Sequence, residues 1–492
     1  MKNFNVVLFL FSTVFMAVAQ TGTNAVAPRE MALQDCIQEA LQHNLDVQIE
    51  RYNPQISLYN LRTAYGGYDP LLSISGQHNY DVTGPEGVPS STSDGNTFSS
   101  GIQGSLPWGL SYDFSGKVSE NYGSYATNFD SSGGSIQVSL TQPLLKNFWI
   151  DNTRLTIRVA KNRLKYSEQG LRQQVITSVT AVENAYYELI YALENVKVQQ
   201  QALELAQTQL DQDRQRVQIQ VLAERSGTIE QDEAQVAQSK ANLIAAQFTL
   251  TSDQNALKNL LTDEYSRWHD MDIQPSATLT APVQIFDLQD SWSKGMSERP
   301  DLLQARLNVQ QQGIQLKFYR NQLFPELDLL GTYGFNGTGR EFSGAFNQFN
   351  EGDRPFYSYG AQMSVPLGNI GPRNQYKSTK ATLKQIVLQL KQLEQNVMVQ
   401  IDNAVKQAQS AYQSADATRQ TRIYAEAALD AEQKKYAVGK STTFTVLQLQ
   451  NNLTSARSQE IRALANYNEA LANLTQQEGS TLDRFGIRIE TQ

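Results

Sequence analysis

The chain has 492 residues, of which 18% are charged and 40% hydrophobic, enough for several cores of domain size. Its net charge of −8 argues against nucleic acid as the main partner, because phosphate binding needs a basic face and no such Lys/Arg cluster is present. A single cysteine, Cys36, excludes an internal disulfide. The three histidines stand far apart without ligand spacing, so we expect no metal site and no cofactor.

The first nineteen residues have the pattern of a secretory signal peptide. Lys2 precedes an apolar run over 6–18, and small residues surround the expected cleavage between Ala19 and Gln20. The run is shorter than a transmembrane anchor needs. Cys36 lies inside an amphipathic helical pattern rather than at the cleavage point, so we expect it to pack and not to carry a lipid. No later segment has 18 consecutive apolar residues, so a membrane crossing would need β-strands.

An internal repeat organises the rest of the chain. At an offset of 255 residues, Leu33-Gln34-Asp35 matches Leu288-Gln289-Asp290 and Pro70 matches Pro325. Farther along the offset is 223, where Gln142-Pro143-Leu144 matches Val365-Pro366-Leu367. The two halves are therefore duplicates, and the first half carries 32 extra residues between its matched strands. That is room for one additional hairpin, with candidate strands over 98–106 and 110–120.

Each half contains segments in which apolar and polar residues alternate, the pattern of β-strands. They include Leu72-x-Ile74, Tyr112-x-Phe114, Ile136-x-Val138-x-Leu140, Leu327-x-Leu329 and Met363-x-Val365. Tyr and Phe recur in these segments, as in the aromatic girdles of outer-membrane barrels. Alternation alone does not distinguish such a barrel from a soluble β-sandwich.

Two Pro-free regions, 144–274 and 373–492, have the periodicity of long helices. In the first, a seam with steps of four and three predicts about six heptads of coiled coil, with polar residues only at Gln200, Gln207 and Arg214. Gly227 and Gly439 are placed for chain reversals, so each region predicts a helical hairpin. The seam residues are Val175, Val179, Val182, Tyr186, Leu189, Leu193, Val196, Gln200, Leu203, Gln207, Leu210, Arg214 and Val217.

These patterns divide the chain into nine expected parts. The first half holds the signal peptide and one copy of each element, and a linker leads to the second copy and a tail. The parts are a signal peptide (1–19), an N-terminal helix (20–68), a strand region with an extra hairpin (69–143), a long helical hairpin (144–262), an equatorial linker (263–287), a second helix (288–322), a second strand region (323–368), a second long helical hairpin (369–478) and a C-terminal tail (479–492).

Several short motifs in this order match one known family. They are Ala40-Leu41-x-x-Asn44-Leu45, Gln142-Pro143-Leu144-Leu145, Arg299-Pro300-Asp301-Leu302, Leu323-Phe324-Pro325, and Tyr436-x-x-Gly439 followed by Val446-Leu447. With them, the chain over 31–479 resembles the TolC-like outer-membrane efflux protein family. No single motif is strong, but their order and duplication together are specific.

The resemblance implies an α+β membrane protein, built from two internal repeats, that assembles as a homotrimer. Each chain would give four strands to a transmembrane β-barrel and four long helices to a periplasmic α-helical coiled-coil tunnel. The strand count stays open because of the 32 extra residues. The implied location is the bacterial outer membrane, with the helices extending into the periplasm. The implied partners are a periplasmic adaptor (membrane fusion) protein and an inner-membrane pump.

The periplasmic tips supply the candidate site residues. Some family members carry two aspartates after the Tyr-x-x-Gly motif, here Tyr436 and Gly439, whereas this sequence has Thr445 and Gln448. An acidic constriction would then come from the first hairpin tip, where acidic residues cluster around Gly227. The alternative is that these acids form a solvated helix face. The acidic candidates are Glu224, Glu230, Asp232 and Glu233.

The sequence offers no convergent acid, base or nucleophile, so we expect no enzyme activity. The favoured function is the outer-membrane exit duct of a tripartite efflux or type I secretion system, a passive conduit for small molecules or secreted proteins. A periplasmic or surface coiled-coil scaffold with a soluble β-domain, serving adhesion, is the alternative. That alternative does not explain why each half inserts its strands between two helical parts.

Overall fold

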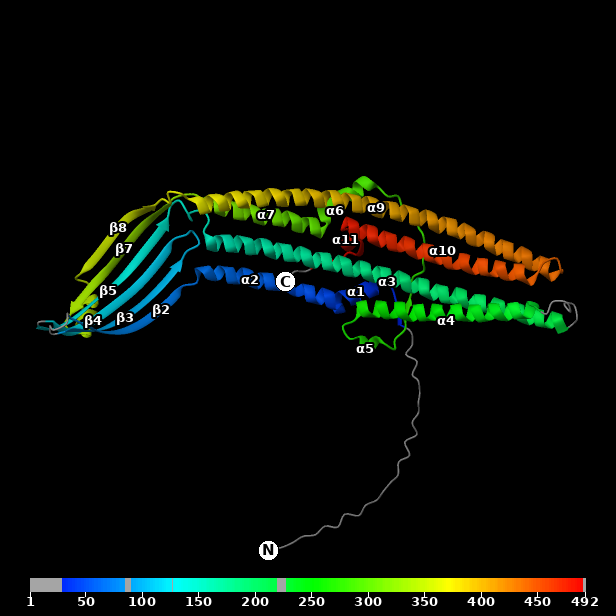
Figure 1. The fold of residues 1–492 in the computed structure, drawn as a ribbon, viewed down its shortest axis with the longest axis horizontal. Coiled ribbons are helices and arrows are strands. Elements are labelled where there is room, and N and C mark those ends of the chain that lie inside the picture. The colour runs from blue at the N-terminus through cyan, green and yellow to red at the C-terminus, as the bar shows by residue number, and fades with distance from the viewer. Residues whose placement is uncertain (1–28, 85–89, 126, 219–226, 490–492) are drawn as a thin grey trace, which may run out of the picture.

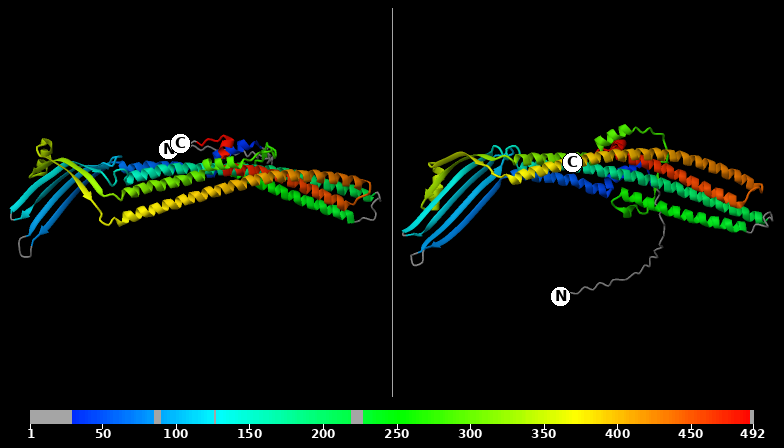
Figure 2. Two further views of the ribbon diagram at one scale, coloured as in Figure 1. Left: turned by 90° about the horizontal axis from the view of Figure 1, so that it is seen from above. Right: turned by 45° about the horizontal axis from the view of Figure 1, so that its top comes forward.

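The computed structural model describes residues 29–84, 90–125, 127–218 and 227–489. The molecule is elongated, with a β-sheet at one end and long helices running to the other end (Figure 1). Short elements surround the helices about midway along their length, and we call this zone the equator (Figures 1 and 2). The expected signal peptide and its cleavage point at Ala19 and Gln20 lie outside the described residues.

The sheet contains six antiparallel strands in the order β2-β3-β4-β5-β7-β8. Ladders join neighbouring strands without interruption, from Leu71↔Gln103 at one side to Leu327↔Met363 at the other. The 32 extra residues form the hairpin β3–β4, which lies inside the sheet between β2 and β5. The strands are β2 (Leu71–Thr83), β3 (Ser91–Ser105), β4 (Ser111–Tyr125), β5 (Thr127–Pro143), β7 (Glu326–Gly339) and β8 (Pro355–Ser364).

The two faces of the sheet differ in chemistry because side chains alternate along each strand. In β2, Leu72, Ile74, Tyr80 and Val82 share one face, and the intervening positions are Ser, Gln, Asn or Asp. The register carries this division across the sheet, since Leu72 pairs with Ile102 on β3. One row on the apolar face is Leu72, Ile102, Phe114, Val138, Tyr333 and Tyr357.

The helix α8 (Phe342–Glu351) connects β7 to β8 and lies against the apolar face of the sheet. Its residue Phe342 makes an edge contact with Phe98, at 5.7 Å between ring centroids. Glycine is required beneath the helix, since a Cβ at Gly337 would lie 2.2 Å from the carbonyl oxygen of Ala345. This helix was not predicted, since the sequence pattern placed 323–368 in a strand region.

Long helices continue from the sheet in both halves of the chain. The two longest, α3 with 67 residues and α9 with 68, are each about 100 Å long at 1.5 Å per residue. Each long pair reverses near a glycine, with Gly227 the first residue of α4 and Gly439 in the turn between α9 and α10 at a φ of 75°. The helices are α2 (Leu45–Tyr65), α3 (Asn152–Gln218), α4 (Gly227–Leu261), α7 (Pro300–Asn321), α9 (Ile370–Ala437) and α10 (Thr443–Glu478).

The N-terminal helix is broken into α1 (Leu33–His43) and α2. Asn44 ends the first and begins the second, because its extended backbone stops α1 and its side-chain oxygen accepts a hydrogen bond from the Val47 N–H at 3.2 Å. The single N-terminal helix expected within 20–68 is therefore wrong at this residue. The remaining short elements are β1 (Arg29–Met31), η1 (Gly66–Tyr68), α5 (Tyr265–Trp268), β6 (Ile273–Pro275), α6 (Leu288–Glu298) and α11 (Thr481–Phe485).

The largest core cluster lies at the equator and joins both ends of the described chain. Met31, Ile273 and Leu482 pack in it beside Tyr186 and Leu189 of α3. The strand β1 pairs in parallel with β6, and the Tyr186 hydroxyl donates to the Met31 carbonyl at 3.1 Å. Cys36 is fully buried in this cluster, and burial raises the pKa of its thiol to about 12. The cysteine therefore packs, as expected from its position in an amphipathic helix.

The predicted coiled-coil seam on α3 is correct only in its first half. Val182 and Leu189 are fully buried, but inside this chain's own core, so they are not free to contact another copy. Farther along, Gln200, Gln207 and Arg214 are exposed, and burial passes to Val198, Ala206, Gln209 and Asp213. The seam is wrong there because α3 leaves α1 and α2 behind and packs against α4 and α10 instead.

None of the helices within the described residues has the length and apolar character that a membrane span requires.

Candidate functional site at the helical tip

A buried polar cluster joins the two helical hairpins at the end farthest from the sheet. The Tyr436 hydroxyl on α9 donates to Asp213 Oδ1 on α3 at 2.7 Å. The Thr443 hydroxyl on α10 donates to Asp213 Oδ2 at 3.1 Å and lies 2.8 Å from the Tyr436 hydroxyl. The Gln209 amide also donates to Asp213, at 2.9 Å. We call Gln209, Asp213, Asp232, Tyr436 and Thr443 the tip cluster.

A second acid, Asp232 of α4, is fully buried in the tip cluster. Its removal from water, followed by the nearby carboxyl of Asp213, raises the pKa of Asp232 to about 7. At neutral pH Asp232, beside Asp213, is therefore protonated for part of the time. Through this pair the cluster takes in α4 as well, so all four helices meet there.

Apolar packing surrounds the tip cluster on the side of the second hairpin. Tyr436 packs with Leu429, Val446 and Leu453 in a small core of its own. The turn that follows Tyr436 is fixed by Thr442, whose side chain accepts a hydrogen bond from the Thr445 N–H at 3.3 Å and so caps α10. This packing holds the Tyr436 hydroxyl in line with Asp213.

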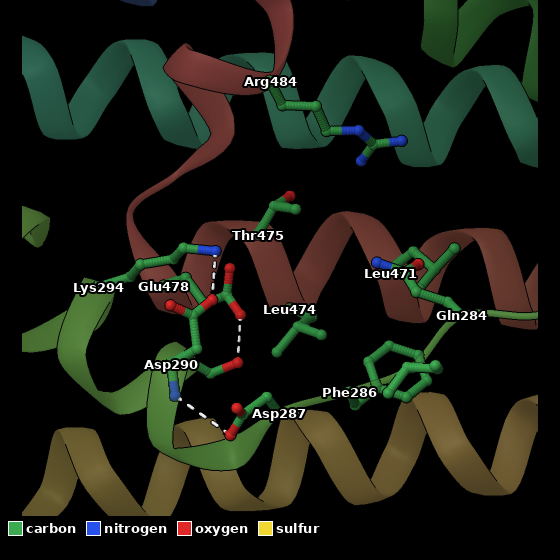
Figure 3. Close-up of a pocket in the computed structure, with 12 residues that line it drawn as sticks. Gln284, Phe286, Asp287, Asp290, Lys294, Leu471, Leu474, Thr475, Glu478 and Arg484 are labelled. Carbon is green, nitrogen blue, oxygen red and sulfur yellow. Dashed lines mark hydrogen bonds and ion pairs between the residues drawn. The ribbon is translucent and has the colours of Figure 1, made fainter.

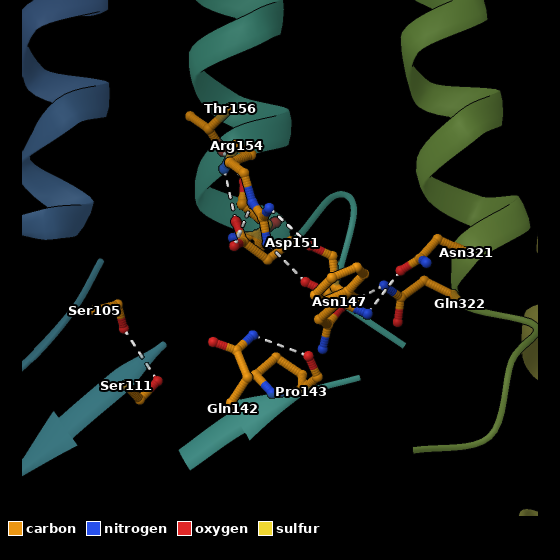
Figure 4. A network of polar contacts seen from close by, with 12 residues as sticks. Ser105, Ser111, Gln142, Pro143, Asn147, Asp151, Arg154, Thr156, Asn321 and Gln322 are labelled. Carbon is orange, nitrogen blue, oxygen red and sulfur yellow. Dashed lines mark hydrogen bonds and ion pairs between the residues drawn. The ribbon is translucent and has the colours of Figure 1, made fainter. Parts of the chain in front are cut away.

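The junction between sheet and helices is the second polar network (Figure 4). Arg154, on the first turn of α3, pairs with Asp151 at 2.8 Å and donates to the carbonyls of Asn147 and Phe148 at 2.7 and 2.8 Å. Asn147, at a φ of 64°, accepts from the Gln322 side chain at 2.8 Å, and its N–H donates to Asn321 at 2.7 Å. The loop after β5 is therefore tied both to α3 and to the end of α7.

Replacing Arg154 by Met should destabilise this junction by about 2 kcal/mol, because three charge-assisted bonds of a mostly buried group are lost. Denaturant unfolding of the detergent-solubilised protein, followed by helix circular dichroism, measures the change. Arg158→Met is the matched control, since Arg158 lies one turn farther along α3 and is exposed. Equal loss of stability in the Arg154→Met and Arg158→Met variants would contradict the conclusion that the bonds of Arg154 stabilise the junction.

A cavity of about 380 Å³ lies at the equator between α6 and the C-terminal part of α10. Phe286, Leu471 and Leu474 line one part of it (Figure 3). The charged groups satisfy one another, since Lys294 pairs with Asp290 at 2.6 Å and Ser291 donates to Glu478 at 2.6 Å. The Ser291–Glu478 hydrogen bond fastens α6 to α10. Among the residues that the structure describes, no group of three or more His, Cys, Asp or Glu side chains is arranged to hold a metal ion.

Known proteins share both the sequence pattern and the fold. Residues 293–480 match the family described as outer membrane efflux protein. Outer membrane protein TolC of Escherichia coli K12 is 24% identical over 349 residues, which cover 70% of this chain and 68% of TolC. Outer membrane efflux protein BepC of Brucella suis is 22% identical over 370 residues, covering 74% of this chain and 76% of BepC.

The chain is similar in sequence and in fold to the TolC-like outer-membrane efflux proteins. The solved CmeC outer membrane channel of Campylobacter jejuni shares the fold at a TM-score of 0.66, with 15% identity over 91% of this chain and 86% of CmeC. The outer membrane protein VceC of Vibrio cholerae gives a TM-score of 0.66, with 18% identity over 91% of this chain and 96% of VceC. This efflux protein is accordingly a protein of the bacterial outer membrane.

The structure brings some of the predicted site residues together and separates others. Tyr436 and Asp232 are buried in the tip cluster. Thr445 is half-buried, and its hydroxyl lies within hydrogen-bond distance of the Thr442 hydroxyl at 2.9 Å, whereas Gln448 is exposed. Gly439 is exposed in the turn, and Gly227 begins α4.

The predicted acidic cluster divides between surface and interior. Glu230 is exposed, and Glu233 pairs with Arg214 at 2.8 Å on the surface, so these two acids have the solvated position that we gave as the alternative. Asp232 is fully buried, so the alternative of a solvated helix face does not account for it. Glu224 lies outside the described residues.

Asp213, the acceptor at the centre of the tip cluster, was not among the predicted site residues. The heptad count placed Leu210 and Arg214 in the seam and passed over Asp213 and Gln209. The sequence did contain a signal for Asp213. Residues 207–215 are mostly polar, although the helix is otherwise amphipathic, and they lie opposite the Tyr-x-x-Gly motif of the second half.

Proposed function

We propose that this protein is the outer-membrane exit duct of a tripartite efflux or type I secretion system. It conducts small molecules or secreted proteins passively, and an inner-membrane pump supplies the energy. The observation that carries the proposal is a sheet with one apolar and one polar face, joined by short tied loops to helices about 100 Å long. A barrel made from such sheets would open directly into a tunnel made from such helices.

The duct is a homotrimer in which each chain contributes two related halves. Support for the duplication comes from the element starts, since α1, α2 and β2 begin at 33, 45 and 71, and α6, α7 and β7 begin at 288, 300 and 326. Each of these pairs is 255 residues apart, the offset found in the sequence. At any level each chain then presents four long helices to the tunnel wall.

The helices extend into the periplasm, and their tips meet a periplasmic adaptor protein. In the closed duct, the tip cluster holds the two hairpins of each chain together through Asp213, Tyr436 and Thr443. Docking of the adaptor and pump opens the duct by separating α3 and α4 from α9 and α10. In this proposal the pump selects the cargo.

The test is purification from the outer-membrane fraction in mild detergent, with mass from light scattering and outline from negative-stain microscopy. We expect a trimer well over 100 Å long that conducts ions in planar bilayers. A monomer or dimer that is released without detergent and forms no conducting pore would refute the duct and favour the coiled-coil scaffold.

A further inference from the structure

The sheet of this chain has more strands than the four that the family resemblance implied. The hairpin β3–β4 could have projected from the sheet, but it pairs with β2 on one side and with β5 on the other. The ladder between β2 and β3 joins 13 residue pairs, from Leu71↔Gln103 to Thr83↔Ser91. The ladder between β4 and β5 runs from Ser111↔Thr141 to Tyr125↔Thr127. The hairpin is therefore an integral part of the sheet.

The inserted strands keep the same division between an apolar and a polar face. On β3 and β4, Phe98, Ile102, Tyr112, Phe114 and Val118 stand in the apolar rows. The opposite face of the same strands carries mostly Ser, Gly, Thr, Gln and Asn. Both inserted strands thus have the alternation of a wall with lipid on one side and water on the other.

The two edge strands, β2 and β8, have no neighbour on their outer sides within the described residues. In an outer-membrane protein an open edge cannot face hydrocarbon, because its N–H and C=O groups would lose their hydrogen bonds to water. With six strands alternating in direction, β2 and β8 run opposite ways. The β8 edge of one copy can therefore pair in antiparallel fashion with the β2 edge of the next copy around a rotation axis.

We propose that three copies of this chain close a transmembrane barrel of eighteen strands, six from each. This inference rests on the trimeric duct of the proposed function and adds the composition and width of its wall. For strands about 4.8 Å apart and tilted about 40°, eighteen strands give a backbone diameter of about 36 Å, and twelve give about 24 Å. The inserted hairpins widen the barrel about 1.5-fold.

The wider barrel matches the tunnel below it. Twelve helices packed side by side at 8–10 Å form a ring about 31–39 Å across. An eighteen-strand barrel continues that ring without narrowing, whereas a twelve-strand barrel would narrow it by about a third. Any cargo that passes the tunnel then also passes the outer membrane, and the polar face offers it a lining of mostly Ser, Thr, Gly, Gln and Asn with a few charges such as Asp113 and Lys117.

Cysteine pairs on one row of the sheet test whether the hairpin lies in the wall. Phe114 and Val138 are direct partners on β4 and β5, whereas Leu72 and Val138 are separated by β3 and β4. In a Cys36→Ala background, Phe114→Cys with Val138→Cys should form an intrachain disulfide in outer membranes, since cross-strand partners lie about 5 Å apart. Leu72→Cys with Val138→Cys should not, because three strand spacings are about 14 Å.

The intrachain bond is detected by mobility of the monomer on a non-reducing gel and by peptide mass. If the hairpin stands outside the wall, β2 lies next to β5, and the Leu72 and Val138 pair links instead. That result, or absence of the Phe114 and Val138 link, overturns the proposal.

Electron microscopy of the detergent-purified protein measures the barrel directly. We expect a three-fold assembly with a barrel about 36 Å across, and deletion of 91–125 should reduce that to about 24 Å. The deletion preserves the register, because Val82, Thr92, Ser124 and Asn128 stand in one row and Val82 then faces Asn128.

A three-fold assembly of the full chain with a barrel near 24 Å overturns the eighteen-strand wall but leaves the duct standing. Absence of any ring-shaped assembly overturns the proposed function itself. If the shortened variant does not fold, the barrel diameter of the full chain and the disulfides of the cysteine variants still test the eighteen-strand barrel.

Discussion

Asp213→Ala should open the helical tip and make the duct leaky. The substitution removes the carboxylate that accepts hydrogen bonds from Tyr436, Thr443 and Gln209. A hydrogen bond to a charged acceptor contributes about 1.5–3 kcal/mol, so the closed tip loses several kcal/mol relative to an open tip in which water reaches these groups. We expect a rise of at least tenfold in the open fraction of single channels in planar bilayers.

Asp211→Ala is the matched control for Asp213→Ala. Asp211 lies two residues earlier on the same helix, and its side chain is exposed. It should conduct like the unmodified protein, and both variants should assemble to the same mass. Closed channels in Asp213→Ala with normal assembly would show that the tip cluster stabilises the fold without holding the duct shut.

Closure of the tip should depend on pH through Asp232. Its pKa is about 7 in the buried cluster against 3.8 for an exposed aspartate, so the closed state holds a proton that the open state releases. Between about pH 4 and pH 7 the closed state therefore becomes less stable as pH rises. The open-to-closed ratio should increase by at most about tenfold per pH unit, the limit for one proton, and should level off above about pH 7.

Asp232→Asn should flatten this pH profile, because an amide stays neutral at every pH. Glu230→Gln, on the exposed face of the same helix, should leave the profile unchanged. The comparison is needed because burial also raises the pKa of Glu183 and of Glu469 to about 7, and their titration contributes to any whole-protein profile. A profile that is as steep in Asp232→Asn as in Glu230→Gln would assign the pH response to other groups.

Alternation in the sequence was enough to find the strands, because one face of the sheet is apolar along its whole width. Leu72, Phe114 and Val138, found as members of alternating segments, stand in one row. The position of the inserted hairpin could not be predicted in the same way. Its pattern fits an edge, an interior place or a projecting loop equally well, and only the register with β2 and β5 distinguishes them.

The tip cluster was only partly predictable, because its burial depends on helices distant in the chain. Tyr436 and Asp232 could be identified as candidates from motif and charge. Asp213 is buried by α9 and α10, more than 200 residues away, and a heptad count along α3 contains no information about which face those helices cover. The break between α1 and α2 was missed because it depends on a single residue, Asn44, and on its capping hydrogen bond.

The equatorial pairing of β1 with β6 determines when this chain can finish folding. Arg29 pairs with Ile273, and Leu482 completes the same core, so the first residues described find their partners only after almost the entire polypeptide has emerged. Contacts between residues so far apart in sequence form slowly. Until they form, the apolar faces of the long helices in the first half remain exposed. The folding chain therefore passes through a late stage in which apolar helix faces are still open to aggregation.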